Sequence, residues 1–114
     1  MTRPQLYGYI SYDGEYTILP QYRYADNFSD GLAVVSNSWN QQEFKYEYFY
    51  YINKQGSQAI EEKFVLASHF FKGVGHVKLM WGKKRGNANS SDGESAFAYI
   101  NTSGTKIFTY WGEK

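Results

Sequence analysis

The sequence contains no cysteine, so the chain can form no disulfide, no thiolate metal site and no thiol nucleophile. Histidine is scarce as well, with only His69 and His76. A metal site built on these two side chains would need a third ligand, and we interpret both as structural or surface residues. His76 is the more unusual of the two, because the equivalent position 42 residues earlier (76 − 34) holds the apolar Val34. We predict no metal and no other cofactor.

Neither sign of charge dominates, and long apolar runs are absent. The chain has 12 basic and 11 acidic residues, so its charge gives no drive toward nucleic acid or an anionic membrane. No segment approaches the roughly 20 apolar residues of a membrane-spanning helix. Residues 1–5 lack the apolar stretch of a signal peptide. Together with the lack of cysteine, this favours a cytoplasmic protein.

The usual sequence signatures of catalysis are also missing. There is no Gly-x-Ser-x-Gly motif for a nucleophilic serine. Gly73 and Gly75 are a lone pair of glycines, which is weak support for a phosphate-binding loop. Glu61 and Glu62 are adjacent, so on a strand they would point to opposite faces and could not act as a pair. We therefore predict that the chain is not an enzyme.

Aromatic residues, in contrast, are abundant. They make up 20% of the chain, and 12 of them are tyrosines. A core of this size does not need so many rings, so several should lie at the surface or between structural units. Tyrosine suits such positions because it has an apolar body and a polar tip.

Part of the sequence is repeated. The pair Tyr9 and Ile10 recurs at a constant offset of 42 residues (51 − 9), and again 48 residues further on (99 − 51). A glycine follows each pair at the same distance, at Gly14, Gly56 and Gly104. Such self-similarity identifies a repeat architecture. Repeats of this kind usually build a surface and not a reaction centre.

Each copy begins with a predicted β-hairpin. Residues 6–11 alternate in a way typical of a strand, and residues 15–19 read as the returning strand. Between them, Asp13 and Gly14 form a strong turn dipeptide. Pro20 should then end the returning strand, because it has no N–H to donate to a neighbour.

The remainder of each copy is predicted to contain a turn and a third strand. Tyr22, Ala25 and Phe28 are spaced three residues apart, which indicates a short helical or 3₁₀ turn. A turn at Gly31 then leads into a strand over residues 32–35. Because this strand connects to the first strand of the next copy, we expect an antiparallel meander in which neighbouring copies pair.

These patterns predict one all-β domain over residues 1–114, with a small barrel or propeller-like curl as the alternative to an open meander. A partial last repeat would leave an open edge strand, which invites self-association. The units are repeat 1 (about 7–35), repeat 2 (about 49–77), partial repeat 3 (about 97–110) and two inserted loops (36–48 and 78–96).

The pattern resembles the WG-repeat family, also called KWG repeats, of bacterial β-rich proteins. Its unit runs Trp-Gly-Tyr-Ile-Asp-x-x-Gly, then Pro-x-Tyr-x-x-Ala, then Phe-x-x-Gly-Leu-Ala-x-Val. The family's Trp-Gly is degenerate here, with Tyr7 and Gly8 in repeat 1. The resemblance implies a β-rich surface for protein or ligand contacts and no known chemistry. The matching residues in repeat 1 are Gly8, Tyr9, Ile10, Gly14, Ile18, Pro20, Tyr22, Ala25, Phe28, Asp30, Gly31, Leu32, Ala33 and Val35.

Two segments are candidate contact surfaces. In the tyrosine-rich run 44–51, alternate side chains would share one face of a strand, and with Trp39 they could form an aromatic platform; inter-repeat packing is the other interpretation. The second segment is a loop that combines basic residues with a tryptophan, which can grip phosphates and stack a base but equally fits a solvated loop. The candidate residues are Trp39, Tyr46, Tyr48, Trp81, Lys83, Lys84 and Arg85.

The sequence therefore predicts a non-catalytic binding module, with protein as the favoured partner through an aromatic-rich β surface. Carbohydrate or cell-envelope binding is one alternative, since exposed rings also suit sugars. An inhibitor or immunity-type partner of another bacterial protein is a second. One basic patch on a nearly neutral chain does not favour nucleic acid.

Overall fold

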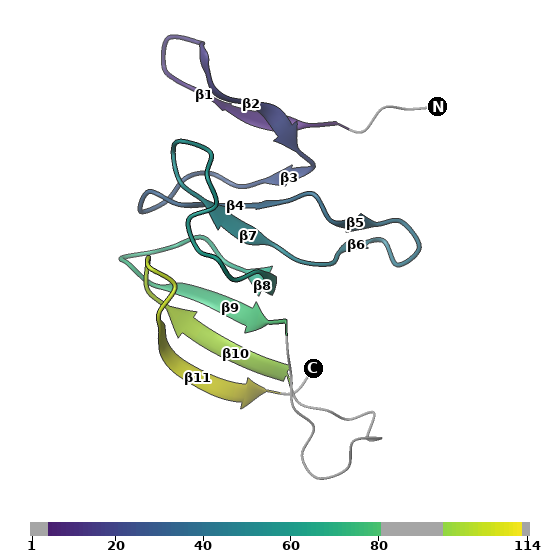
Figure 1. Ribbon diagram of the computed structural model, residues 1–114, viewed down its shortest axis with the longest axis vertical. Helices are drawn as coiled ribbons and strands as arrows, with labels where there is room; N and C mark the ends of the chain where they lie inside the picture. Colours follow the sequence, from purple (N-terminus) through teal and green to yellow (C-terminus); the bar gives the residue numbers. More distant parts are fainter. Residues whose placement is uncertain (1–4, 81–94, 113–114) are drawn as a thin grey trace.

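The computed structural model describes residues 5–80 and 95–112, and within these ranges the chain forms strands and turns only (Figure 1). The strands are β1 (Tyr7–Ile10), β2 (Tyr16–Tyr22), β3 (Tyr24–Ala25), β4 (Ala33–Ser36), β5 (Trp39–Asn40), β6 (Lys45–Tyr46), β7 (Tyr50–Ile52), β8 (Phe64–Ala67), β9 (Gly75–Leu79), β10 (Ser95–Ile100) and β11 (Lys106–Gly112).

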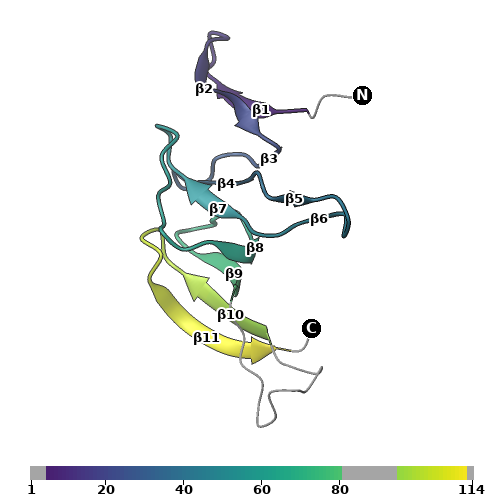
Figure 2. The same ribbon diagram turned by 45° about the vertical axis from the view of Figure 1, so that its right-hand side comes forward.

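The strands follow one another as an antiparallel meander along the long axis of the molecule (Figures 1 and 2). The hairpin β1–β2 lies at one end, the sheet β3-β4-β7 in the middle, and the sheet β11-β10-β9-β8 at the other end. Strands β5 and β6 form a separate hairpin that projects to the side. The predicted all-β meander is confirmed. None of these sheets closes on itself, so the barrel alternative is wrong.

Pro20 lies within β2, and the expectation that it ends the strand is wrong. Tyr9 pairs with Ile18 across the hairpin. At the next paired position Tyr7 is opposite Tyr22, so β2 carries extra residues that have no partner in β1. This bulge holds the proline outside the regular ladder, where its missing N–H costs no hydrogen bond.

Repeat 2 contains the same bulge, whereas the third hairpin does not. Ile52 forms a bridge with Gln58, and Phe49 forms one with Phe64, which repeats the shift seen between β1 and β2. Beyond one irregularity next to its turn, the ladder between β10 and β11 runs without interruption from Tyr99 to the end of β11. The bulge therefore occurs in the two full repeats, where the hairpin is followed by a further strand of the same repeat.

The expected helical turn is also wrong, since the described residues contain no helix. The segment instead forms β3, which pairs with β4 through a tight turn at Asp30 and Gly31. Both turn residues have positive φ angles, 55° and 82°, as in the type I′ turn that matches the twist of paired strands. A bend at Arg23 between β2 and β3 lets both Tyr22 and Ala25 face the core. Two core residues three positions apart also occur in a helical turn, which explains the wrong prediction.

The equivalent turn of repeat 2 has the same shape and touches the first. Lys72 and Gly73 have φ angles of 53° and 83°. The N–H of Gly73 donates to the carboxylate of Asp30 at 2.7 Å, and the hydroxyl of Ser29 donates to the carbonyl of Phe70. The tight turns of the two repeats are thus linked by hydrogen bonds.

The buried side chains form two clusters, and each cluster contains residues of more than one repeat. The repeats also stack through the glycine turn of each following hairpin. A Cβ on Gly56 would lie 3.5 Å from Ile18, and a Cβ on Gly104 would lie only 2.7 Å from Ile60. The smaller cluster contains Ile18, Tyr22, Ala33, Val35 and Ile52. The larger one contains Leu32, Val34, Tyr51, Ile60, Phe64, Phe70, Val77, Leu79, Ala96, Ala98 and Ile100.

The tyrosine-rich run 44–51 is not one strand, so its expected division into two faces is wrong. Phe44 has a φ angle of 54° and lies in the turn before β6. The chain then leaves β6 and starts β7 only at Tyr50. The first inserted loop therefore carries a hairpin of its own, and most of the second, residues 81–94, lies outside the described residues.

Candidate functional site

An aromatic face covers one side of the four-stranded sheet. Side chains alternate between the two sides of a strand, and in β10 the inward positions hold the buried residues Ala96, Ala98 and Ile100. The outward positions of β10 and of its neighbours β9 and β11 hold rings. We define the aromatic face by His76, Phe97, Tyr99, Phe108 and Tyr110.

The rings of the aromatic face stack on one another. His76 lies between its neighbours, with ring centroids 4.7 Å from Tyr99 and 5.8 Å from Phe97. Its plane is within 7° of that of Tyr110. This near-parallel, offset arrangement is the favourable one for ring pairs. His76 therefore replaces an apolar repeat residue because it belongs to a layer of rings.

A hydrogen bond fixes the centre of this face. The Nε2 atom of His76 lies 2.7 Å from the hydroxyl oxygen of Tyr110. Desolvation by the packed neighbours, with a further contribution from Tyr99, raises the pKa of the Tyr110 hydroxyl. A tyrosine hydroxyl is protonated at neutral pH, so it can donate to Nε2 of His76.

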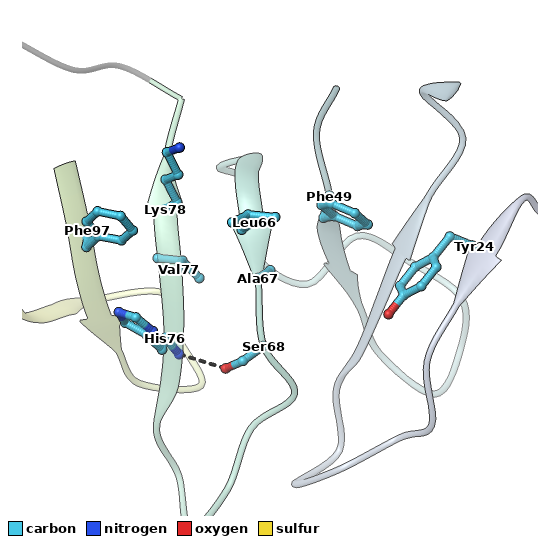
Figure 3. Close-up of a pocket in the computed structure, with 9 residues that line it drawn as sticks. All are labelled: Tyr24, Phe49, Leu66, Ala67, Ser68, His76, Val77, Lys78 and Phe97. Atoms are coloured by element: carbon cyan, nitrogen blue, oxygen red, sulfur yellow. Dashed lines mark hydrogen bonds between the residues drawn. The ribbon is translucent and has the colours of Figure 1, made fainter. Parts of the chain in front are cut away.

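A groove of about 320 Å³ adjoins the aromatic face (Figure 3). It lies between the two larger sheets, with Phe97 and His76 on one side, and Tyr24 and Phe49 on the other. Leu66 stands between these sides and is 54% exposed. The groove is lined by Tyr24, Phe49, Leu66, Ala67, Ser68, His76, Val77, Lys78 and Phe97.

The structure brings Trp39 and Tyr46 together, as neighbours across the β5–β6 hairpin. Their ring centroids are 5.0 Å apart in an edge-to-face arrangement. Tyr46 also contacts Tyr24 and Phe49, and its hydroxyl donates to the carbonyl of Arg23 at 3.0 Å. Both predicted residues are thus half-buried in a packed cluster that borders the groove.

Tyr48 takes part in none of these ring contacts, but together with Trp39 it lines a second pocket. Its ring lies 4.8 Å from the ammonium group of Lys63. The predicted basic loop falls outside the described residues. That loop contains Trp81, Lys83, Lys84 and Arg85.

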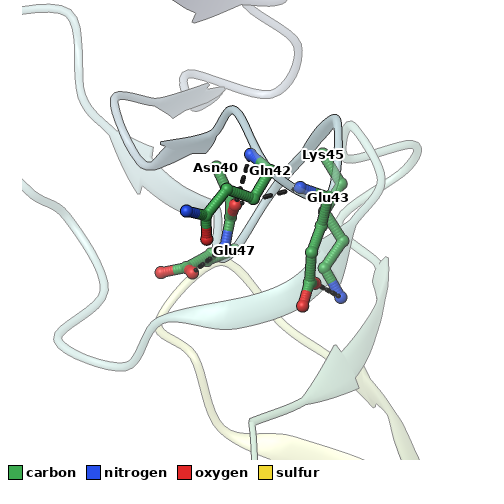
Figure 4. Close-up of polar contacts among 5 residues, drawn as sticks. All are labelled: Asn40, Gln42, Glu43, Lys45 and Glu47. Atoms are coloured by element: carbon green, nitrogen blue, oxygen red, sulfur yellow. Dashed lines mark hydrogen bonds and ion pairs between the residues drawn. The ribbon is translucent and has the colours of Figure 1, made fainter.

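The polar tip of the β5–β6 hairpin is internally satisfied (Figure 4). The side-chain amide of Asn40 donates to Glu47 at 2.7 Å, and its oxygen accepts from the N–H groups of Gln42 and Glu43. Lys45 pairs with Glu43 at 3.2 Å. These contacts shape the turn and leave few polar groups for a ligand. Over the described ranges, no group of three or more acidic or histidine side chains is placed to hold a metal ion.

Sequence analysis missed the aromatic face apart from His76. A signal was present, because Phe97 and Tyr99 alternate with alanines, and Phe108 and Tyr110 are two residues apart. What the sequence does not indicate locally is that β9, β10 and β11 lie side by side in this register.

The fold is thus an open antiparallel β-meander built from repeated hairpins, with a ring-covered face and no helix in the part that the structure describes. Residues 7–38 match the family model of the WG containing repeat. The chain therefore carries a repeat of the WG family, and the resemblance is confirmed over β1 to β4. No curated protein and no solved structure matches the chain. No helix among the described residues is long and apolar enough to cross a membrane.

Proposed function

We propose that the chain is a non-catalytic binding module that recognises another protein through the aromatic face and the adjoining groove. The observation that carries this proposal is the exposure of large apolar side chains on one sheet surface. Tyr99 and Phe108 on the face are 39% and 59% exposed, and Leu66 in the groove is 54% exposed. Contiguous apolar surface of this kind is typical of interaction sites, and aromatic residues are enriched in them.

The stacking favours protein over carbohydrate. Sugar rings bind to aromatic side chains that present a flat ring face. In the aromatic face the rings of His76, Phe97 and Tyr110 lie nearly parallel, with centroids 5.3 to 5.9 Å apart, so that they partly cover one another. Ring edges are left for a partner, and a protein surface can match them. An inhibitor-type role toward another protein would use the same surface, and the lack of cysteine fits a cytoplasmic setting.

The test is a comparison of two double variants in affinity capture with quantitative mass spectrometry. Tyr99→Ala with Phe108→Ala removes two exposed rings of the face. Tyr12→Ala with Tyr16→Ala removes two exposed rings from the first hairpin, where Tyr12 is fully exposed and Tyr16 is 56% exposed. A partner captured by the unaltered chain and by the first-hairpin variant, but not by the face variant, supports the proposal. Equal capture by all three chains contradicts it.

The carbohydrate alternative is tested with the same variants on a glycan array. Binding of a defined glycan by the unaltered chain, lost with Tyr99→Ala and Phe108→Ala, would favour that alternative. We expect no such binding. Circular dichroism and melting temperatures of the variants ensure that a loss of binding reflects the surface and not the fold.

Self-association through β11 is a second candidate, favoured by the position of this strand. Among the described residues β11 pairs only with β10, so its other edge is open to a further strand. Ile107 and Phe108 on this strand are 58% and 59% exposed. Size-exclusion chromatography with light scattering should reveal a dimer that Ile107→Lys disrupts. A monomer at every concentration contradicts this candidate.

A further inference from the structure

The groove beside the aromatic face has an asymmetric chemistry. Leu66, Val77 and Phe97 supply apolar surface, and Tyr24 and Phe49 supply two further rings. Its volume of about 320 Å³ is at the lower end of the range of about 300–1,000 Å³ found for ligand sites. The groove is therefore suited to one large side chain or a similarly small group.

A single ammonium group distinguishes one end of this groove. The Nζ atom of Lys78 lies 6.0 Å from the ring centroid of Phe97. Within the described part of the chain it forms no ion pair, whereas Lys45 and Lys106 each bind a glutamate. No aspartate or glutamate lines the groove. The charge of Lys78 is thus uncompensated within the groove.

At the opposite end, polar groups already bond to one another within the protein. The N–H of His76 donates to the hydroxyl of Ser68 at 2.9 Å, which ties β9 to the end of β8 (Figure 3). The His76 ring is held by Tyr110. The groups at this end are already hydrogen-bonded, so a polar ligand group gains most at the Lys78 end.

We infer that the groove binds a peptide segment in which an aromatic side chain stands next to a carboxylate, with the ring between Phe49 and Phe97 and the carboxylate at Lys78. This inference rests on the proposed function and specifies the chemistry of the protein partner. Ring stacking supplies contact area. The ion pair supplies selectivity, because a cationic segment would meet like charge.

The experiment uses three capped tripeptides as probes, with tryptophan between two glutamates, two glutamines or two lysines. Each is titrated into the isotopically labelled chain and followed by the shifts of backbone amide resonances. We expect the acidic peptide to bind most tightly and the basic one most weakly. The largest shifts should occur at Leu66, His76 and Phe97. The preference should shrink at high salt, because ions screen exposed charges.

Two charge variants sharpen the test. Lys78→Gln should lower the affinity for the acidic peptide by up to about fivefold, which is the scale of a partly exposed ion pair. The affinity for the glutamine peptide should not change. Lys54→Gln removes the same charge from the exposed second hairpin turn and should change neither. Melting temperatures confirm that both variants fold.

The outcomes separate this inference from the proposed function. Equal affinity for all three peptides, equal effects of the two lysine variants, or shifts away from the groove would each overturn the inference. The proposed function would survive those results if Tyr99→Ala with Phe108→Ala still abolished capture of the partner. It would fail only if that double variant captured the same proteins as the unaltered chain.

Discussion

Repeats 1 and 2 share a backbone path down to individual hydrogen bonds. The hydroxyl of Tyr9 donates to the carbonyl of Asp26 at 2.7 Å. The hydroxyl of Tyr51 donates to the carbonyl of Ser68 at 2.6 Å, and both ends of this bond lie 42 residues further on (51 − 9 and 68 − 26). The repeated residues therefore specify the same local geometry twice.

The two repeats differ in how deeply equivalent side chains are buried. Phe70 is 0% exposed, whereas its counterpart Phe28 is only partly buried and packs beside Tyr9 at 4.6 Å. One reason is that the sheet of repeat 2 continues into β10 and β11, which extends the core cluster. A second reason is Gly75, where repeat 1 has Ala33, because a Cβ on Gly75 would lie 3.1 Å from the Phe70 ring. The repeat thus sets the path, and the neighbouring strands set the burial.

The largest expected effect comes from truncating the two phenylalanines. Phe70→Ala should lower the free energy of unfolding by about 3–5 kcal/mol, the usual cost of removing a buried ring. Phe28→Ala should cost about half as much, because its ring is already partly in water. Urea unfolding of both variants measures the difference. Equal losses would mean that the two cores contribute equally, contrary to their burial.

Equivalent substitutions in the two tight turns should cost the same stability, unlike those in the two cores. Gly31→Val and Gly73→Val should each cost about 1–3 kcal/mol, because both glycines have φ angles near 80° that a β-branched residue resists. No atom lies within 4 Å of a Cβ built on either glycine, so the loss is backbone strain and not a clash. Gly31→Asn, a residue that tolerates this conformation, is the matched control and should cost less. Unchanged melting temperatures for both valine variants would refute the turn assignment.

The features that could be predicted from the sequence are those set by local chemistry. The hairpin turn at Asp13 and Gly14 and the strand after Gly31 follow from residues within a few positions of each other, and both are confirmed. Pro20 was misread because its place depends on pairing: in a bulge its missing N–H is no defect. The spacing of Tyr22 and Ala25 was misread as helical. The bend between β2 and β3 interrupts the alternation of side chains along the strand, so both residues face the core.

The aromatic face could be predicted only in part for a related reason. Alternation within β10 shows that Phe97 and Tyr99 share a side. It does not show that Tyr110 and His76 flank them, since this depends on the register of three strands. Tyr46 was predicted as a candidate from the alternation of the tyrosine-rich run, and Trp39 as a ring that could join it in an aromatic platform. Their contact across a two-residue ladder depends instead on the turn before β6, where Phe44 has a positive φ angle.

The repeated tyrosine bond offers a smaller test of the comparison. Tyr51→Phe should cost about 1–2 kcal/mol because it leaves a carbonyl without its donor. Tyr9→Phe should cost less than about 1 kcal/mol, because water can reach the partly buried site. Denaturant unfolding at pH 7 measures both values. Equal losses would show that burial of the bond does not matter.

The raised pKa values of Tyr9 and Tyr51 predict a loss of stability at alkaline pH. Burial, followed by the charges of neighbouring groups, raises the pKa of Tyr9 to about 12, and burial raises that of Tyr51 further. A pKa raised in the folded state means that the stabilisation is complete below the usual pKa of about 10 and is lost as pH rises through the folded value. Unfolding measured from pH 9 to 12 should show this fall, and Tyr51→Phe should reduce it. An unchanged pH profile in that variant would contradict the prediction.

A small net effect is expected for exchanging the residues that differ between the repeats. Gly75→Ala gains about 0.5–1 kcal/mol because alanine loses less conformational freedom in a strand. It loses about 1–3 kcal/mol by crowding Phe70, so a net loss of about 1 kcal/mol should result. Combining Gly75→Ala with Phe70→Leu removes the crowded ring, and the two losses should then be clearly less than additive. Additive losses in this double-mutant cycle would mean that Gly75 does not make room for Phe70, and that the extra strands alone account for the deeper core of repeat 2.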